Sequence, residues 1–327
     1  MKKIIKNFNL IFFFTVLVAF LFSTSVHAQK KIRIAMAEPP SDELAAFFLA
    51  LDRAKKNGLN YEYTAFADEE LAIQAVISGQ MDIGFGTPYS VMQKSKAPIR
   101  IVYQMSKLIF FPVTTKKYNK LEDLNGQSIM LHSRGGGTDS IANVIEERSK
   151  IKFGNRVYVS GSKNRVAALT SGQTEATIID LSNKNRLMRS EAGNKFNVLK
   201  MFPVNASDEA IFANLNWIKA NEKDVDIFIQ ALISVYKDMH KDPTIIAKQT
   251  DPNGPIGKLP KQVLESLDGF YKDAVEGGLY DVNGGGRIAA KADMDWYHRS
   301  GQLTGDIKNL KIEDFWYFAP LDKAVKK

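Results

Sequence analysis

The stretch LHSRGGGTDSIANV, residues 131–144, carries residue types suited to holding a small ligand. Three successive glycines, Gly135 to Gly137, let backbone approach a ligand closely. The helix expected after them presents unpaired N–H groups and the positive end of its dipole from Thr138 onward. Arg134 adds a guanidinium suited to a carboxylate, a sulfonate or a phosphonate. The alternative is an ordinary surface turn with a solvated arginine.

Catalytic chemistry finds little support in the sequence. His132, His240 and His298 follow the apolar leader, and none has the HExxH spacing of a zinc site. There is no G-x-S-x-G elbow, and the acidic run 68–70 is typical of a helix start. The absence of cysteine rules out disulfides and thiol chemistry. We therefore expect a binding protein with no cofactor and no metal site, and not an enzyme.

The first residues predict export. A basic start, MKKIIKN, precedes the apolar run Leu10 to Phe22, and Val26-His27-Ala28 forms a small-x-small cleavage site. The alternative is a membrane anchor, which needs roughly 20 apolar residues. This run is shorter, so we predict a signal peptide over residues 1–28, cleaved near Ala28, and a periplasmic protein.

Composition narrows the class of partner. Removing residues 1–28 removes three lysines and no acid, so the formal charge falls from +8 to 8 − 3 = +5. The remaining charges are interspersed, and no basic tract with interleaved aromatics points to nucleic acid. We expect a small-molecule ligand instead, bound by a protein that acts as a monomer.

The chain contains a long internal repeat. AVISGQMDIGF (75–85) and ALTSGQTEATI (168–178) lie ninety-three residues apart, and each ends an apolar helical run and leads into a short strand. The surrounding patterns read β-α-β-α-β twice, which predicts parallel strands with helices on their faces. The sequence therefore predicts an α/β protein with two Rossmann-like lobes, each built on a mainly parallel sheet.

The tail differs from the two repeats. Residues 222–243 predict an amphipathic helix that should pack on the first lobe. Such a return requires two crossings between the lobes, which we expect near Val113–Lys117 and Phe202–Ala206. The predicted domains are residues 29–114 with 205–327 for lobe I, and 115–204 for lobe II.

Ligands gather at the carboxyl ends of parallel strands. This rule selects three loops besides 131–138, namely Glu38–Ser41, Gly86–Ser90 and Asp180–Asn183. Ser41 is also the expected N-cap of the first helix. Tyr89 could cover an apolar face of a ligand, and its alternative is packing at a helix start.

The quoted segments resemble a known family. AIQAVISGQMDIGFG, KLEDLNGQSIMLHSRGGGT, FIQALISVYKDMHKDP and DFWYFAPLDKAV are similar to segments of substrate-binding proteins of ABC importers for nitrate, sulfonates, taurine and thiamine-precursor pyrimidines. The resemblance implies a periplasmic-binding-protein-like fold with a two-crossing hinge, a ligand between the lobes and a transmembrane permease as partner. It places the ligand-binding loops at Glu38, Pro40, Ser41, Thr87, Tyr89, Ser133, Arg134, Gly136, Gly137, Thr138 and Asp180.

The ligand class rests on few side chains. Arg134 and the helix start favour a small organic carboxylate or sulfonate, and Tyr89 with Phe110 and Phe111 leaves room for a carbon skeleton. A pyrimidine-like heterocycle is the alternative, favoured if Asp180 faces the ligand. Two other classes remain open, an exported enzyme on the same fold and a receptor of a tripartite transporter or a sensor kinase.

Overall fold

The computed structural model describes residues 31–36, 41–66, 69–134, 136–202, 204–249 and 251–326. The predicted signal peptide and two expected ligand-binding residues, Glu38 and Pro40, lie outside them. Ile32–Lys327 forms one compact unit, separate from Met1–Lys31. Among the described residues, no helix is long and apolar enough to cross a membrane.

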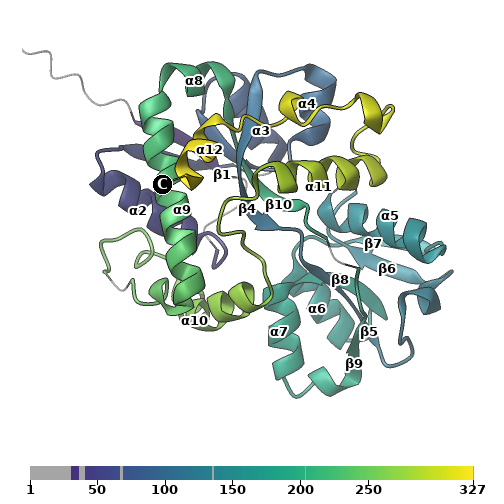
Figure 1. Ribbon diagram of the computed structural model, residues 1–327. Helices are drawn as coiled ribbons and strands as arrows, with labels where there is room; N and C mark the ends of the chain where they lie inside the picture. Colours follow the sequence, from purple (N-terminus) through teal and green to yellow (C-terminus); the bar gives the residue numbers. More distant parts are fainter. Residues whose placement is uncertain are drawn as a thin grey trace, which may run out of the picture. The chain divides into compact units, whose positions relative to one another are not determined.

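The fold is built on two five-stranded sheets (Figure 1). The first has the order β2-β1-β3-β10-β4 and the second the order β7-β6-β8-β5-β9. The first sheet consists of β1 (Ile32–Met36), β2 (Tyr61–Ala65), β3 (Ile83–Gly86), β4 (Ile99–Lys107) and β10 (Ser207–Asn214). The second consists of β5 (Phe110–Thr115), β6 (Ser128–Leu131), β7 (Asn155–Tyr158), β8 (Ala176–Asp180) and β9 (Phe196–Val198).

The two sheets have the same topology. In each, the first strand pairs in parallel with the second and third strands, as β1 does with β2 and β3 and β6 with β7 and β8. One strand of each sheet, β10 or β5, is antiparallel to both its neighbours. The two Ser-Gly-Gln segments occupy the same turn before the third strand. Gly79 and Gly172 there have φ values of 75° and 78°, which favour glycine. The α/β prediction is confirmed.

The helices connect and cover the strands (Figure 1). They are α2 (Ala45–Lys56), α3 (Glu69–Ile77), α4 (Tyr89–Ser95), α5 (Gly137–Ser149), α6 (Ser162–Thr170), α7 (Leu181–Arg189), α8 (Leu215–Ala220), α9 (Glu222–Lys241), α10 (Lys261–Glu276), α11 (Gly286–Arg299) and α12 (Ala319–Val325). The predicted amphipathic helix is α9, which packs against α2 through a buried face that includes Phe228 and Leu232. The tail therefore returns to the elements of the first sheet.

The chain changes sheet twice. The first change lies at residues 108–109, between β4 and β5, and corrects the expected crossing at Val113–Lys117. Val113 is already paired with Thr177 of β8. No Gly, Pro, Asn or Asp lies between β4 and β5, so the sequence pattern did not mark the change. The second change lies between Val198 and Ser207 and includes the expected 202–206.

The first helix begins later than expected. α2 starts at Ala45 with Leu44 before it, and no side chain caps it. The Tyr271 hydroxyl accepts a hydrogen bond from Ala46 N at 2.7 Å and donates one to the Asp42 carbonyl at 2.8 Å. A residue of the distant tail thus satisfies the helix start, which corrects the assignment of Ser41 as its N-cap.

Candidate functional site

The loop after β6 and the start of α5 contain most of the predicted ligand-binding residues. The hydroxyl of Thr138 accepts a hydrogen bond from His132 N at 2.8 Å, and Thr138 is buried. A Cβ added to Gly136 would lie 2.5 Å from Ser133 Oγ, so the loop closes on itself there. Gly136 is the N-cap of α5 and no side chain caps this helix. The positive end of the helix dipole therefore lies at this loop, where it favours a negatively charged group.

The start of α5 faces elements of the first sheet. A Cβ added to Gly137 would lie 3.6 Å from Leu108 Cδ1 and 3.8 Å from Asp208 Oδ1. Leu108 follows β4, and Asp208 belongs to β10. The glycine loop of the second sheet thus lies at the point where the chain changes sheet.

Arg134 is exposed beside this loop. Its guanidinium lies 5.4 Å from the centre of the Tyr158 ring, which holds the side chain by a cation–π contact. No carboxylate among the described residues forms an ion pair with it. Its role in holding an anion stays a prediction.

A second arginine at this edge was missed from the sequence. Arg165 of α6 is 1% exposed and donates to the Ile178 carbonyl at 3.1 Å, the Val159 carbonyl at 3.0 Å and Ser162 Oγ at 2.8 Å. None of the described carboxylates lies within ion-pair distance of it. Burial lowers the pKa of Arg165 to about 10, so it stays charged at neutral pH. Its helical spacing with buried Ala168 and Leu169 was the available signal.

Asp180 acts as the N-cap of α7. Its Oδ1 accepts a hydrogen bond from Asn183 N at 2.7 Å, and Asn183 Nδ2 contacts both carboxylate oxygens. Asp42 lies near it, with its Oδ2 at 3.5 Å from Ser182 Oγ. Burial raises the pKa of Asp42, and the charge of Asp180 raises it further. Two carboxylates thus approach each other between the two sheets.

Ser41 and Thr87 come from the loops of the first sheet. Ser41 is partly buried just before Asp42. Thr87 N donates to Glu69 Oε1 at 2.5 Å, so Glu69 at the start of α3 fastens the end of β3. Burial raises the pKa of this carboxyl.

Tyr89 belongs to the core. Its ring is fully buried and stacks on Tyr297 at a centroid distance of 4.6 Å. Its hydroxyl donates to Asp293 and accepts from Trp316 Nε1 at 2.9 Å. The expectation that Tyr89 covers a ligand is corrected, because both faces and the hydroxyl are used in packing. Burial raises the pKa of Asp293 to about 6.

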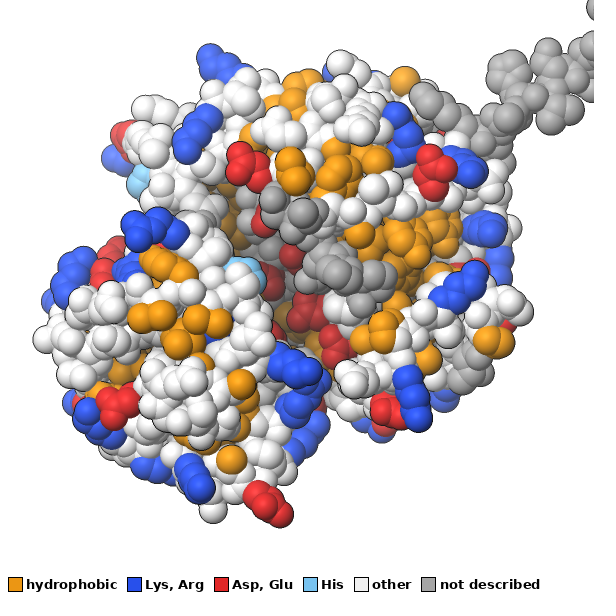
Figure 2. All heavy atoms as spheres, turned by 180° about the vertical axis from the view of Figure 1, so that it is seen from behind, with side chains coloured by type: hydrophobic (Ala, Val, Ile, Leu, Met, Phe, Trp, Pro, Cys, Tyr) orange, Lys and Arg blue, Asp and Glu red, His pale blue; other side chains and the backbone are white. Residues whose placement is uncertain are grey.

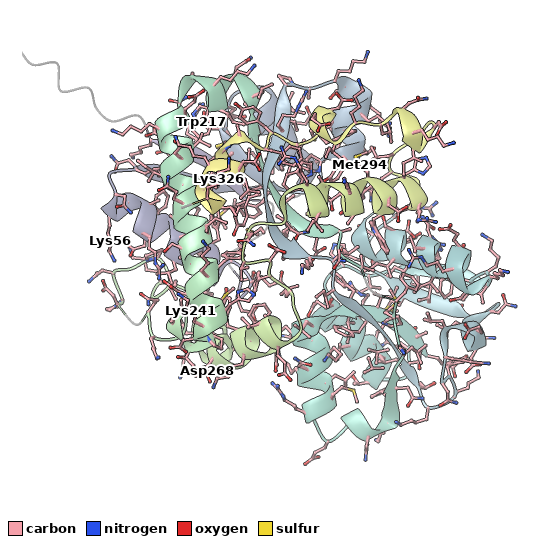
Figure 3. All side chains as sticks on the ribbon, viewed as in Figure 1. Lys56, Trp217, Lys241, Asp268, Met294 and Lys326 are labelled. Atoms are coloured by element: carbon pink, nitrogen blue, oxygen red, sulfur yellow. The ribbon has the colours of Figure 1, made fainter. Side chains whose placement is uncertain are left out.

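Charge is distributed unevenly over this region. Acidic side chains gather in the recess at the centre of the face in Figure 2. Lysines elsewhere point into solvent, as Lys56 and Lys241 do in Figure 3, with side chains 74% and 79% exposed. We therefore assign the solvated lysines no part in binding.

A surface pocket of about 590 Å³ lies away from these loops. Its lining residues are Asn125, Asn143, Glu146, Glu147, Lys150, Ile151 and Lys152. They surround the C-terminal half of α5, whereas the predicted ligand-binding residues surround its start. Within the described part of the chain, no group of three or more His, Asp or Glu side chains could hold a metal ion.

The two sheets have the same strand order, and the chain passes from the first to the second and back again. This arrangement defines a fold of the periplasmic-binding-protein class, and solved structures of that class match it. The sequence model of the family described as NMT1/THI5 like matches residues 45–245, and the chain belongs to this family. A search of curated protein sequences finds no match.

Three of the similar solved structures are binding proteins. The ligand-binding component of an ABC-type import system from Staphylococcus aureus, with zinc bound, has a TM-score of 0.67 and 13% identity, covering 91% of this chain and 100% of its own. A putative periplasmic sulfonate-binding protein from Methylobacillus flagellatus has a TM-score of 0.63 and 16% identity, and the match covers 92% of this chain and 95% of that protein. The periplasmic nitrate-binding protein from Synechocystis has a TM-score of 0.62 and 12% identity, and the match covers 92% of this chain and 89% of that protein. At these identities the likeness establishes the fold.

Proposed function

We propose that the protein is a periplasmic receptor that captures a small organic anion between its two sheets and delivers it to an ABC importer. The observation that carries the proposal is the charge at the edge of the second sheet. Among the described residues, no carboxylate forms an ion pair with exposed Arg134 or with buried Arg165, and the start of α5 lies beside them. Fixed cationic groups and the positive end of a helix dipole at one edge favour an anionic group of the ligand.

The named structures support the role of receptor. They include sulfonate- and nitrate-binding proteins and a binding component of an import system. We propose by analogy that this chain binds its ligand without converting it, that its partner is a transmembrane permease, and that it acts as a monomer. The leader over residues 1–28 supports export to the periplasm.

A pyrimidine-like heterocycle is the second candidate ligand. It is favoured by the carboxylates of Asp42 and Asp180, which lie close enough for the charge of Asp180 to raise the pKa of Asp42. Ring and amino N–H groups would donate to such oxygens, whereas a bare anion would be repelled by them.

A thermal-shift screen of the mature chain tests both candidates. The probes are ethanesulfonate, propionate and cytosine, and a ligand that binds the folded chain raises the melting temperature by mass action. We expect ethanesulfonate or propionate to raise the melting temperature of the wild type but not that of Arg134→Ala. Lys241→Ala is the control, because it removes the same unit of charge from an exposed site, and the ligand should still raise its melting temperature.

The outcomes separate the ligand classes. A shift with cytosine alone would reject the anion and favour the heterocycle. An anion shift that survives in Arg134→Ala would remove this residue from the site. A shift with none of the three probes would count against both proposed classes.

A further inference from the structure

The ring of His132 is held in one orientation at the edge of the second sheet. His132 follows β6 directly, and its Nδ1 lies 3.1 Å from Gly161 N and 3.5 Å from Nη1 of Arg165. A backbone N–H and a guanidinium are both donors and never acceptors. Nδ1 must therefore carry a lone pair, and the proton of the neutral ring sits on Nε2.

The other nitrogen of the ring is left available. Among the described residues, no hydrogen bond reaches Nε2, and His132 as a residue is exposed. The backbone is fixed as well, because His132 N donates to Thr138 at the start of α5. One end of the ring is thus anchored by two donors, and the other end carries an unused N–H.

We infer that His132 is a specificity-determining residue that donates its Nε2–H to an anionic group of the ligand, beside Arg134 and the start of α5. The inference rests on the proposed receptor function. Arg165 then has a second task, because its buried guanidinium sets the tautomer of the ring through Nδ1. The two arginines differ in role, since Arg134 supplies charge directly and Arg165 acts through the histidine.

Protonation of the ring would disrupt this arrangement. The imidazolium would place an N–H on Nδ1, facing the N–H of Gly161 and the charge of Arg165. Burial and the charge of Arg165 both lower the pKa of His132, in agreement with a neutral ring at pH 7. Asp180 acts on Arg165 from the next strand and partly balances its charge, and Arg134, two residues on, adds positive charge nearby.

The tautomer can be measured without any ligand. Histidine-selective ¹⁵N labelling and two-bond ¹H–¹⁵N correlation spectra of the mature chain distinguish the two ring nitrogens. At pH 7 we expect His132 to show the protonated nitrogen at Nε2 and to titrate below the ordinary range of histidine. A proton on Nδ1, or a charged ring at pH 7, would overturn the inference.

Two variants separate the anchor from the donor. His132→Asn keeps an acceptor oxygen near the position of Nδ1 but has no group at Nε2. His132→Gln places an amide donor near the position of Nε2 but loses the acceptor for Gly161. By calorimetry with ethanesulfonate or propionate, whichever shifts the melting temperature, we expect His132→Asn to bind about tenfold more weakly, the effect of one lost hydrogen bond. His132→Gln should lose less.

The two proposals fail in different ways. If the wild type binds no anion, the proposed anion receptor fails and takes the role of His132 with it. If the wild type binds an anion and His132→Asn binds it equally tightly, the histidine inference alone is wrong. Melting temperatures of the unliganded variants identify a variant that does not fold, and the other variant of the pair then decides.

Discussion

The two copies of the repeated half-domain place different charges at the same backbone positions. A shift of 93 residues superposes Glu69, Ala72 and Thr87 of the first copy on Ser162, Arg165 and Asp180 of the second. One hydrogen bond is common to both copies. Glu69 accepts from Thr87 N in the first, and Ser162 Oγ accepts from Asp180 N at 3.3 Å in the second. The helix start and the end of the third strand are therefore tied together in the same way.

The charged groups on this common frame differ between the copies. The first copy has a carboxyl at its helix start and a buried alanine, Ala72, one turn later. The second has a serine at the helix start and the buried guanidinium of Arg165 one turn later. The repeat thus preserves one hydrogen bond between helix start and third strand. Its first copy carries the carboxyl of Glu69, and its second carries the guanidinium of Arg165 together with the carboxylate of Asp180. Groups of both signs are therefore present, which is why we keep both an anion and an N–H-rich ring as candidate ligands.

The largest predicted effect is at the position where the copies differ most. Arg165→Ala removes donors from the buried Ile178 carbonyl, the partly buried Val159 carbonyl and Ser162 Oγ, and it leaves a cavity. Relief of the buried charge offsets part of the loss. We expect the free energy of unfolding to fall by about 2–4 kcal/mol, measured by urea denaturation.

Arg165→Lys is the control for charge. It keeps the positive charge but cannot reproduce the fork of donors, so we expect a smaller but clear loss of stability. Equal stability of wild type and Arg165→Ala would contradict the structural role assigned to this side chain.

Patterns repeated along the chain made the fold predictable. Alternation, helical spacing and the Ser-Gly-Gln turns all report local structure, and they predicted the succession of strands and helices along both half-domains. The change of sheet at residues 108–109 has no such local signal, because no Gly, Pro, Asn or Asp lies between β4 and β5. The late start of α2 depends on Tyr271, more than 200 residues away, which local patterns do not reveal.

The candidate site was less predictable than the fold. Arg134 and the glycine loop were recognisable from residue type, since exposed charge and small residues follow a strand. Tyr89 was misjudged because its burial depends on Tyr297, Trp316 and Asp293 from the tail. The roles proposed for His132 and Arg165 were missed because they depend on how the two side chains are placed in the folded chain. The sequence does not show that Nδ1 of His132 faces the guanidinium of Arg165.

The second prediction compares the acids that follow the two Ser-Gly-Gln turns. Asp82 is buried and accepts from Arg33 N at 2.9 Å and from its guanidinium at 2.6 and 3.0 Å. Its equivalent, Glu175, is exposed and meets Lys117 at 3.0 Å. We expect Asp82→Asn to cost about 2 kcal/mol of unfolding free energy and Glu175→Gln less than 1 kcal/mol, since an exposed pair is solvent-screened.

Urea denaturation of both variants at pH 7 measures this difference. The same comparison in high salt sharpens it, because salt should reduce the small effect at Glu175 more than the effect at Asp82. If Asp82→Asn and Glu175→Gln lost the same unfolding free energy, burial would not make the ion pair of Asp82 more stabilising than that of Glu175.

The smallest predicted effect concerns the acid at the first helix start. Burial raises the pKa of Glu69 above its ordinary 4.5, so the folded chain holds this proton more tightly than the unfolded chain. The stabilisation is therefore fully present below pH 4.5 and is lost as the pH rises through the folded pKa. Glu69→Gln keeps an acceptor for Thr87 N and does not titrate. We expect the variant to match the wild type at pH 4 and to be the more stable of the two at pH 7. Ser162 of the second copy does not titrate, so the unfolding free energy lost in Ser162→Ala should not depend on pH. If the stabilities of wild type and Glu69→Gln changed with pH in the same way, the carboxyl of Glu69 would be solvated and not buried.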